Sequence, residues 1–187
     1  MRHEIIMSGF GGQGVMVMGQ LLAYAGMLEQ KKVTWMPSYG PEMRGGTANC
    51  SVIIADEPIG SPVISEPTAA VIMNLPSLDR FEGAVRAGGV LIVNCSLIDK
   101  AVTRKDIKVC RVPINDIASE LGSVKMINMV ALGALLAATG VAAEESVIAA
   151  FAKKFAAKPQ LVEINQTALR QGWLFSRDLE PHIQPTG

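Results

Sequence analysis

Apolar and polar positions follow two different periods along the first two thirds of the chain. Short apolar runs rich in β-branched residues alternate with longer stretches of helical periodicity. The short runs predict strands at 4–9, 32–37, 47–55, 69–73, 90–94 and 108–113. The longer stretches predict helices at 13–30, 77–85, 117–121, 128–138, 144–155 and 159–175, the second of them capped by Ser77. This order favours a three-layer α/β/α fold with a Rossmann-like, largely parallel sheet and a helical C-terminal part.

No repeat or linker-like segment divides the sequence, so we expect one domain over residues 1–187. The first helix is apolar on nearly every side, which predicts burial on more than its sheet-facing side. The strand 47–55 instead alternates, with Thr47, Asn49 and Ser51 on one face of its first half. That face is expected to meet water, a ligand or a partner.

The composition is more apolar than is usual for a soluble monomer, since 49% of residues are apolar and 18% are charged. Either a membrane span or a surface covered by another protein would explain this. The uncharged segment 126–143 is long enough to span, but it is mostly Ala and Gly and contains Asn128 and Thr139. We therefore expect a buried helix, no membrane association and, because no signal peptide is seen, a cytoplasmic protein.

Charge, cysteine and histidine content argue against several other classes of protein. The formal net charge is zero and no basic cluster occurs, so nucleic-acid binding is not expected. Cys50, Cys95 and Cys110 are widely separated in apolar runs, which predicts free thiols rather than cluster or zinc ligands. His3 and His182 have no metal-ligand neighbourhood, and no nucleophile–base set is visible, so we predict neither a metal site nor catalytic residues.

A glycine-rich turn follows the first strand directly. Gly9, Gly11 and Gly14 fit the G-x-G-x-x-G spacing in a strand–turn–helix context, and Gly12 and Gln13 complete the turn. Backbone N–H groups and a helix N-terminus there suit a phosphate or carboxylate, so these five residues are candidate cofactor-binding residues. A nicotinamide cofactor is disfavoured, because the second strand ends at Val33–Pro37 without an acidic residue. Tight strand–helix packing is the structural alternative.

A second glycine-flanked loop links the second and third predicted strands. Pro41 stiffens its backbone, whereas Gly40, Gly45 and Gly46 permit backbone conformations that other residues avoid. The loop also contains one acid and one arginine. Arg44 is a natural clamp for phosphate or carboxylate, whereas the structural alternative is a hairpin with a solvated Glu42–Arg44 pair. The residues assigned to an interface or active-site edge are Tyr39, Gly40, Pro41, Glu42, Arg44, Gly45, Gly46, Thr47, Asn49 and Asn128. Asn128 is included because an amide in an apolar helix needs a hydrogen-bond partner.

Three segments together resemble the gamma subunit of 2-oxoacid:ferredoxin oxidoreductases. They are Gly9-Phe10-Gly11-Gly12-Gln13-Gly14, then Ser38-Tyr39-Gly40-Pro41-Glu42-Met43-Arg44-Gly45-Gly46, then Asn128-Met129-Val130-Ala131-Leu132-Gly133. Size, order and spacing agree over essentially the whole chain. The second loop is more similar to the 2-oxoglutarate, ketoisovalerate and pyruvate branches than to the indolepyruvate branch.

The resemblance implies a structural and interface role near the active site of a multi-subunit oxidoreductase. Such enzymes decarboxylate a 2-oxoacid oxidatively, form acyl-CoA and pass electrons to ferredoxin. Thiamine diphosphate, Mg2+, [4Fe-4S] clusters and coenzyme A are then expected in the complex, with none bound by this chain alone. The implied partners are alpha and beta subunits, with a delta subunit left open, and ferredoxin through the complex. The alternatives are a stand-alone Rossmann-like nucleotide-binding enzyme and a scaffold whose glycines only permit close packing.

Overall fold

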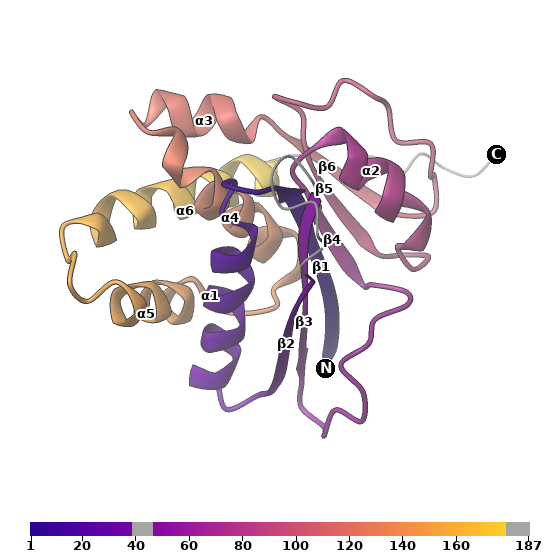
Figure 1. The fold of residues 1–187 in the computed structure, drawn as a ribbon, viewed down its shortest axis with the longest axis horizontal. Helices are drawn as coiled ribbons and strands as arrows, with labels where there is room; N and C mark the ends of the chain where they lie inside the picture. Colours follow the sequence, from indigo (N-terminus) through magenta and orange to yellow (C-terminus); the bar gives the residue numbers. More distant parts are fainter. Residues whose placement is uncertain (39–46, 179–187) are drawn as a thin grey trace.

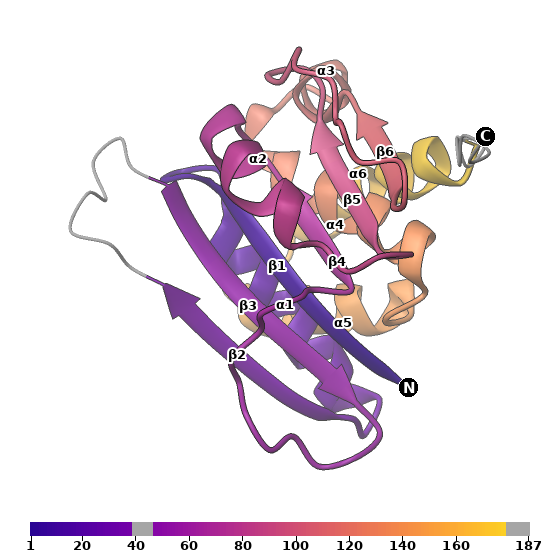
Figure 2. The same cartoon turned by 90° about the vertical axis from the view of Figure 1, so that its right-hand side faces the viewer.

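A six-stranded mixed sheet forms the centre of the molecule. The computed structural model describes residues 1–38 and 47–178. The strands are β1 (Arg2–Phe10), β2 (Lys32–Ser38), β3 (Thr47–Ala55), β4 (Ala69–Ile72), β5 (Val90–Asn94) and β6 (Lys108–Val112). They lie in the order β2-β3-β1-β4-β5-β6 (Figure 2).

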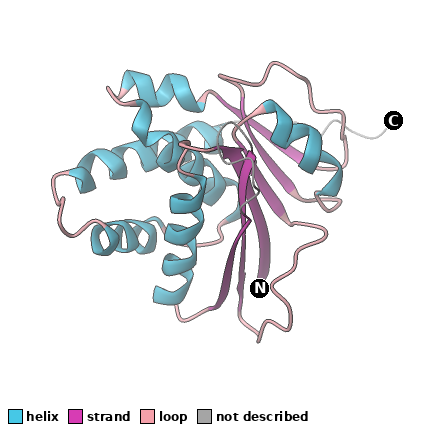
Figure 3. Cartoon of the chain, viewed as in Figure 1, coloured by secondary structure: helices cyan, strands magenta, loops and turns pink. Residues whose placement is uncertain are grey.

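Helices lie on both faces of the sheet, but very unequally. The α-helices are α1 (Val15–Leu28), α2 (Leu75–Phe81), α3 (Ile114–Glu120), α4 (Ile127–Thr139), α5 (Glu144–Lys154) and α6 (Leu161–Asp178). The short 3-10 helices are η1 (Glu82–Ala84) and η2 (Val124–Met126). Of the α-helices in residues 1–38 and 47–178, α2 alone packs on one face, and the other five gather on the opposite face (Figures 1 and 3). The expected three layers and helical C-terminal part are therefore confirmed.

The pairing of the strands refines the expected sheet. β1, β4, β5 and β6 pair in parallel, as alternating strands and helices predict. β2 and β3 instead form an antiparallel hairpin, and β3 also pairs antiparallel with β1. The sheet is thus mixed, because the hairpin inserts β3 between the two strands that the sequence order places first and second.

The larger core lies under α1, α4, α5 and α6. α1 is buried between the sheet and α5, as its nearly uniform apolar surface predicts. Its last turn is an exception, where Tyr24, Met27 and Leu28 remain exposed. α4, within the uncharged segment 126–143, is almost completely buried, so that segment is a core helix. Among the described helices, none combines the length and the apolar character that crossing a membrane requires.

One helix begins differently from the expectation. Ser77 was expected to cap α2, but the cap is Asn74, whose side-chain oxygen accepts a hydrogen bond from the Ser77 N–H at 2.9 Å. Pro76 occupies the first turn, where its missing N–H costs nothing. The Ser77 hydroxyl instead meets the Ser8 hydroxyl of β1 at 2.8 Å, in a fully buried position.

A buried carboxylate anchors the long connection between β5 and β6. The side chain of Glu82 accepts hydrogen bonds from the Thr103 N–H at 2.6 Å, the Thr103 hydroxyl at 2.7 Å and the Arg104 N–H at 3.3 Å. Burial alone would raise the pKa of Glu82, but these hydrogen bonds outweigh it and lower the pKa. Glu82 is therefore held as a carboxylate that ties residues 103 and 104 to η1.

Candidate functional site at the carboxyl edge of the sheet

The sheet has its topological switch point between β1 and β4. The chain leaves β1 toward α1 on one face and leaves β4 toward α2 on the other (Figure 1). In open α/β sheets, ligands bind outside the carboxyl ends of the strands at such a point. The glycine turn 9–14 lies there, as its strand–turn–helix context predicts.

Three glycines of this turn, Gly9, Gly12 and Gly14, are required by its geometry. A Cβ on Gly9 would lie 2.5 Å from the Gln13 side-chain oxygen and 2.7 Å from the Met73 Cβ. Gly12 and Gly14 have φ of 95° and 74°, the left-handed region that favours glycine. Gly14 is also the N-cap of α1 and offers no side chain to the first-turn N–H groups. These groups can therefore serve an anionic group above the turn.

Gln13 connects the turn to the neighbouring strand. Its side-chain oxygen accepts a hydrogen bond from the Phe10 N–H at 2.7 Å, and its amide nitrogen donates to the Met73 carbonyl at 3.3 Å. Gln13 is buried. The polar atoms of Gln13 thus hold the turn against the end of β4. The backbone N–H groups at the start of α1 are therefore the candidates for binding a ligand.

Asn128 lies against the same turn, although more than a hundred residues separate the two in the sequence. A Cβ on Gly14 would lie 2.9 Å from the Asn128 amide nitrogen. Asn128 is buried in the first turn of α4, whose N-cap Met126 makes no side-chain capping bond. The structure therefore brings two of the three family-like segments together.

The predicted edge residues of β3 lie beside the end of β1. Thr47 pairs with Phe10 and Asn49 with Ser8, so their side chains share one face of the sheet. Thr47, Asn49 and Ser51 are half-buried, and α2 does not extend over this part of the sheet (Figure 2). The predicted residues Tyr39, Gly40, Pro41, Glu42, Arg44, Gly45 and Gly46 lie outside the described residues.

Sequence reasoning missed a cluster of buried amides at this edge. Asn74 follows β4 and Asn94 ends β5; the Asn94 amide nitrogen donates to Asn115 at 2.8 Å and to the Met73 carbonyl at 3.4 Å. The Asn74 amide nitrogen and the Asn94 amide oxygen are buried and have no hydrogen-bond partner in the part of the chain that the structure describes. Each such atom costs about 1–3 kcal/mol. The available signal was an asparagine directly after each of two buried apolar strands.

The edge carries no activated nucleophile among the described cysteines. All three are free thiols, as expected. Burial raises the pKa of Cys50 to about 12, and burial also raises the pKa of Cys95 and of Cys110. The described residues also include no group of three or more His, Cys, Asp or Glu placed to hold a metal ion. What this edge offers is backbone N–H groups and neutral amides, which bind and orient.

Strand order separates this sheet from a dinucleotide-binding fold. In that fold the second strand is the parallel neighbour of the first, and its end meets the cofactor ribose. Here antiparallel β3 occupies the place beside β1. The end of β2 is therefore one strand too far away to serve that purpose, which weakens the stand-alone nucleotide-binding alternative.

Comparison with known proteins gives the family. Residues 4–174 match the family model described as pyruvate ferredoxin/flavodoxin oxidoreductase, and the chain belongs to this family. It is 39% identical over 171 residues to the ketoisovalerate oxidoreductase subunit VorA of Methanothermobacter marburgensis, which covers 90% of this chain but 35% of that protein. It therefore spans only about a third of that relative.

Other relatives have a length closer to that of this chain. The 2-oxoglutarate synthase subunit KorC of Methanocaldococcus jannaschii is 37% identical over 150 residues, which cover 78% of this chain and 80% of KorC. The crystal structure of the keto/oxoacid ferredoxin oxidoreductase gamma subunit from Geobacter sulfurreducens superposes with a TM-score of 0.81 at 30% identity. That match covers 93% of this chain and 98% of the other. The resemblance drawn from the three sequence segments is confirmed.

Proposed function

We propose that this chain is the gamma component of a multi-subunit 2-oxoacid:ferredoxin oxidoreductase. The observation that carries the proposal is the family match over 4–174, together with similarity to relatives named as subunits of such enzymes. The reaction would convert a 2-oxoacid and coenzyme A to an acyl-CoA and CO2, with the electrons passed to ferredoxin. 2-Oxoglutarate, ketoisovalerate and pyruvate are the candidate substrates. The complex would be cytoplasmic.

In this proposal the chain shapes and closes the site, and other subunits supply the reacting groups. Thiamine diphosphate with Mg2+ and the [4Fe-4S] clusters would reside on alpha and beta subunits, or on a delta subunit. Two features support an orienting role, namely the glycine turn 9–14 at the switch point and the Asn74–Asn94 amides beside it. The turn would bind an anionic group at the subunit boundary through its N–H groups.

The second loop is proposed to act at the same boundary. Arg44 and Glu42 would orient groups of a partner or substrate, and Thr47 and Asn49 would line the adjoining sheet face. We expect Arg44→Ala to lower complex assembly or turnover, and an unchanged enzyme would contradict this assignment. Asn128 would support the glycine turn from α4.

The test is purification of the chain, tagged at its natural locus, from its native cell. We expect stoichiometric recovery of the other subunits and 2-oxoacid-dependent, coenzyme A-dependent reduction of ferredoxin. Activity with each of the three 2-oxoacids then identifies the substrate. Purification of the chain alone, with the activity left in the unbound fraction, would refute the proposal. Calorimetry of the isolated chain with nucleotides tests the stand-alone alternative.

A further inference from the structure

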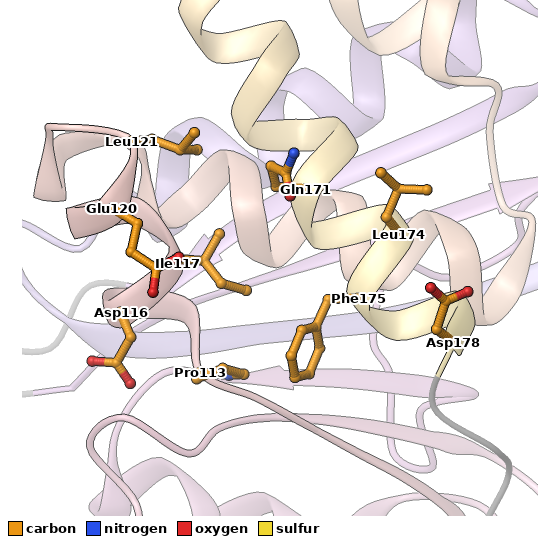
Figure 4. Close-up of a pocket in the computed structure, with 9 residues that line it drawn as sticks. All are labelled: Pro113, Asp116, Ile117, Glu120, Leu121, Gln171, Leu174, Phe175 and Asp178. Atoms are coloured by element: carbon orange, nitrogen blue, oxygen red, sulfur yellow. The ribbon is translucent and has the colours of Figure 1, made fainter.

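A concave surface lies between α3 and α6, far from the glycine turn in sequence. It encloses about 560 Å³ and is lined from both helices and from Pro113 (Figure 4). From α6 it receives Gln171, Leu174, Phe175 and Asp178, which are spaced to share one side of the helix. The buried α6 residues Ala168, Leu169 and Gly172 lie on the adjoining side of the helix. We call this surface the α3–α6 groove.

The floor of the α3–α6 groove is apolar and open. Leu174 is 39% exposed and Phe175 38% exposed, although both are large side chains on a well-formed helix. Ile117 of α3 and Leu121, directly after α3, face them and are only half-buried. Figure 4 shows Ile117 and Phe175 projecting into the space between the helices. An exposed apolar patch rimmed by polar residues is typical of an interaction site.

The rim of the groove is acidic. Among the described residues, Asp116, Glu120 and Asp178 line it, and no Lys, Arg or His does. Within the described residues, Asp116 and Glu120 form no ion pair, and Asp116 accepts only the Ser96 hydroxyl at 2.9 Å. Asp178 pairs with its neighbour Arg177 at 3.0 Å, an exposed contact of little energetic value. The described residues that line the groove therefore carry a net negative formal charge.

We propose that the α3–α6 groove binds a cationic segment of another subunit. An apolar side chain of that segment enters between Ile117 and Phe175, while Lys or Arg side chains pair with Asp116 and Glu120. Charge complementarity selects this occupant, because a neutral or acidic segment would leave or repel the unpaired carboxylates. The apolar floor supplies the affinity, and the rim supplies orientation and partner choice. This inference rests on the proposed function, since it requires a partner subunit.

The test uses the full chain, tagged in its native cell in place of the natural copy. The variant Glu120→Lys with Leu174→Lys reverses one rim charge and places a cation on the floor. Both side chains are exposed, so the fold is expected to be unaffected. The matched control is Glu57→Lys with Val63→Lys, which makes the same changes in the exposed connection between β3 and β4. Urea unfolding checks that both variants are folded.

We expect recovery of partner subunits to fall at least tenfold for the groove variant and to stay unchanged for the control. A photo-crosslinking residue at position 174 should attach to a Lys- or Arg-bearing apolar segment of one partner. Recovery by the wild-type chain should also weaken with salt.

Two failures are distinguishable. If the wild-type chain recovers no other subunit, the proposed function itself is refuted. If it recovers them and the groove variant does so equally well, only the groove assignment is overturned. Crosslinking at position 174 to this chain's own residues 179–187, or to a segment without cations, overturns it as well.

Discussion

The crossing of α4 and α6 makes a sharp prediction about stability. Gly133 on α4 and Gly172 on α6 face each other's helix, and the two backbones are in contact. A Cβ on Gly133 would lie 1.9 Å from the Leu169 carbonyl oxygen, and a Cβ on Gly172 would lie 2.0 Å from the Val130 carbonyl oxygen. Gly133→Ala or Gly172→Ala must therefore force the helices apart.

The size of the effect follows from two opposing contributions. Alanine in a helix interior is favoured over glycine by about 1 kcal/mol. Carbon–oxygen contacts in close helix packing lie at about 3.3–3.6 Å, so relief requires a shift of more than 1 Å. Such a gap forfeits about a quarter to a half of the dispersion attraction across the interface, and overpacking typically costs about 1–3 kcal/mol or more. A shift of more than 1 Å lies at the upper end of that range, so we expect each variant to lose about 2 kcal/mol net, or on the order of 5 °C in Tm.

Urea unfolding followed by far-ultraviolet circular dichroism measures this loss as a lower urea midpoint. The slope of the unfolding free energy against urea concentration should be the same in wild type and variant. Gly83→Ala is the matched control, because nothing lies within 4 Å of a Cβ there and its φ is not positive. It should be neutral or slightly stabilising through the unfolded chain. If Gly133→Ala unfolds at the wild-type urea midpoint, the helices do not cross with their backbones in contact.

Other predictions concern the glycine turn, the buried carboxylate and the thiols. Gln13→Leu should lower the free energy of unfolding by about 1–3 kcal/mol in urea titrations, because the Phe10 N–H loses its side-chain partner and the Met73 carbonyl keeps only the longer hydrogen bond from Asn94; wild-type stability would contradict its role in the turn. Glu82→Gln should cost about 1.5–3 kcal/mol near pH 7. Because the folded pKa of Glu82 is lowered, its contribution is complete above the ordinary value of 4.5 and is lost as pH falls through the folded pKa. The difference between wild type and this variant should thus shrink toward pH 3, and an equal difference at both pH values would exclude the effect. In the native chain at pH 8, a thiol reagent should modify Cys95 and spare Cys50 and Cys110 until urea is added; three fast reactions would show that the buried thiols are accessible.

Local patterns in the sequence were sufficient for most of the secondary structure. β3 spans 47–55 as predicted, because its β-branched run and alternation are properties of the segment itself. The glycine turn was also predictable, since its spacing and flanking elements are adjacent in the chain. The assignment of Ser77 as the cap of α2 was wrong. Asn74, three residues earlier, is an equally good capping residue, and its side chain accepts the hydrogen bond from the Ser77 N–H.

The tertiary structure alone decided how these segments meet. Insertion of β3 beside β1 depends on pairing between distant residues, which no local propensity encodes. The same holds for Asn128 against Gly14 and for the backbone contact of α4 with α6, where glycines that look like weak helix formers prove to be required by a neighbouring helix. The sequence by itself thus determined the elements, the turn and the family resemblance. Packing of remote surfaces determined the strand order, the buried amides and the α3–α6 groove, because contacts between distant segments form only when the whole chain is folded.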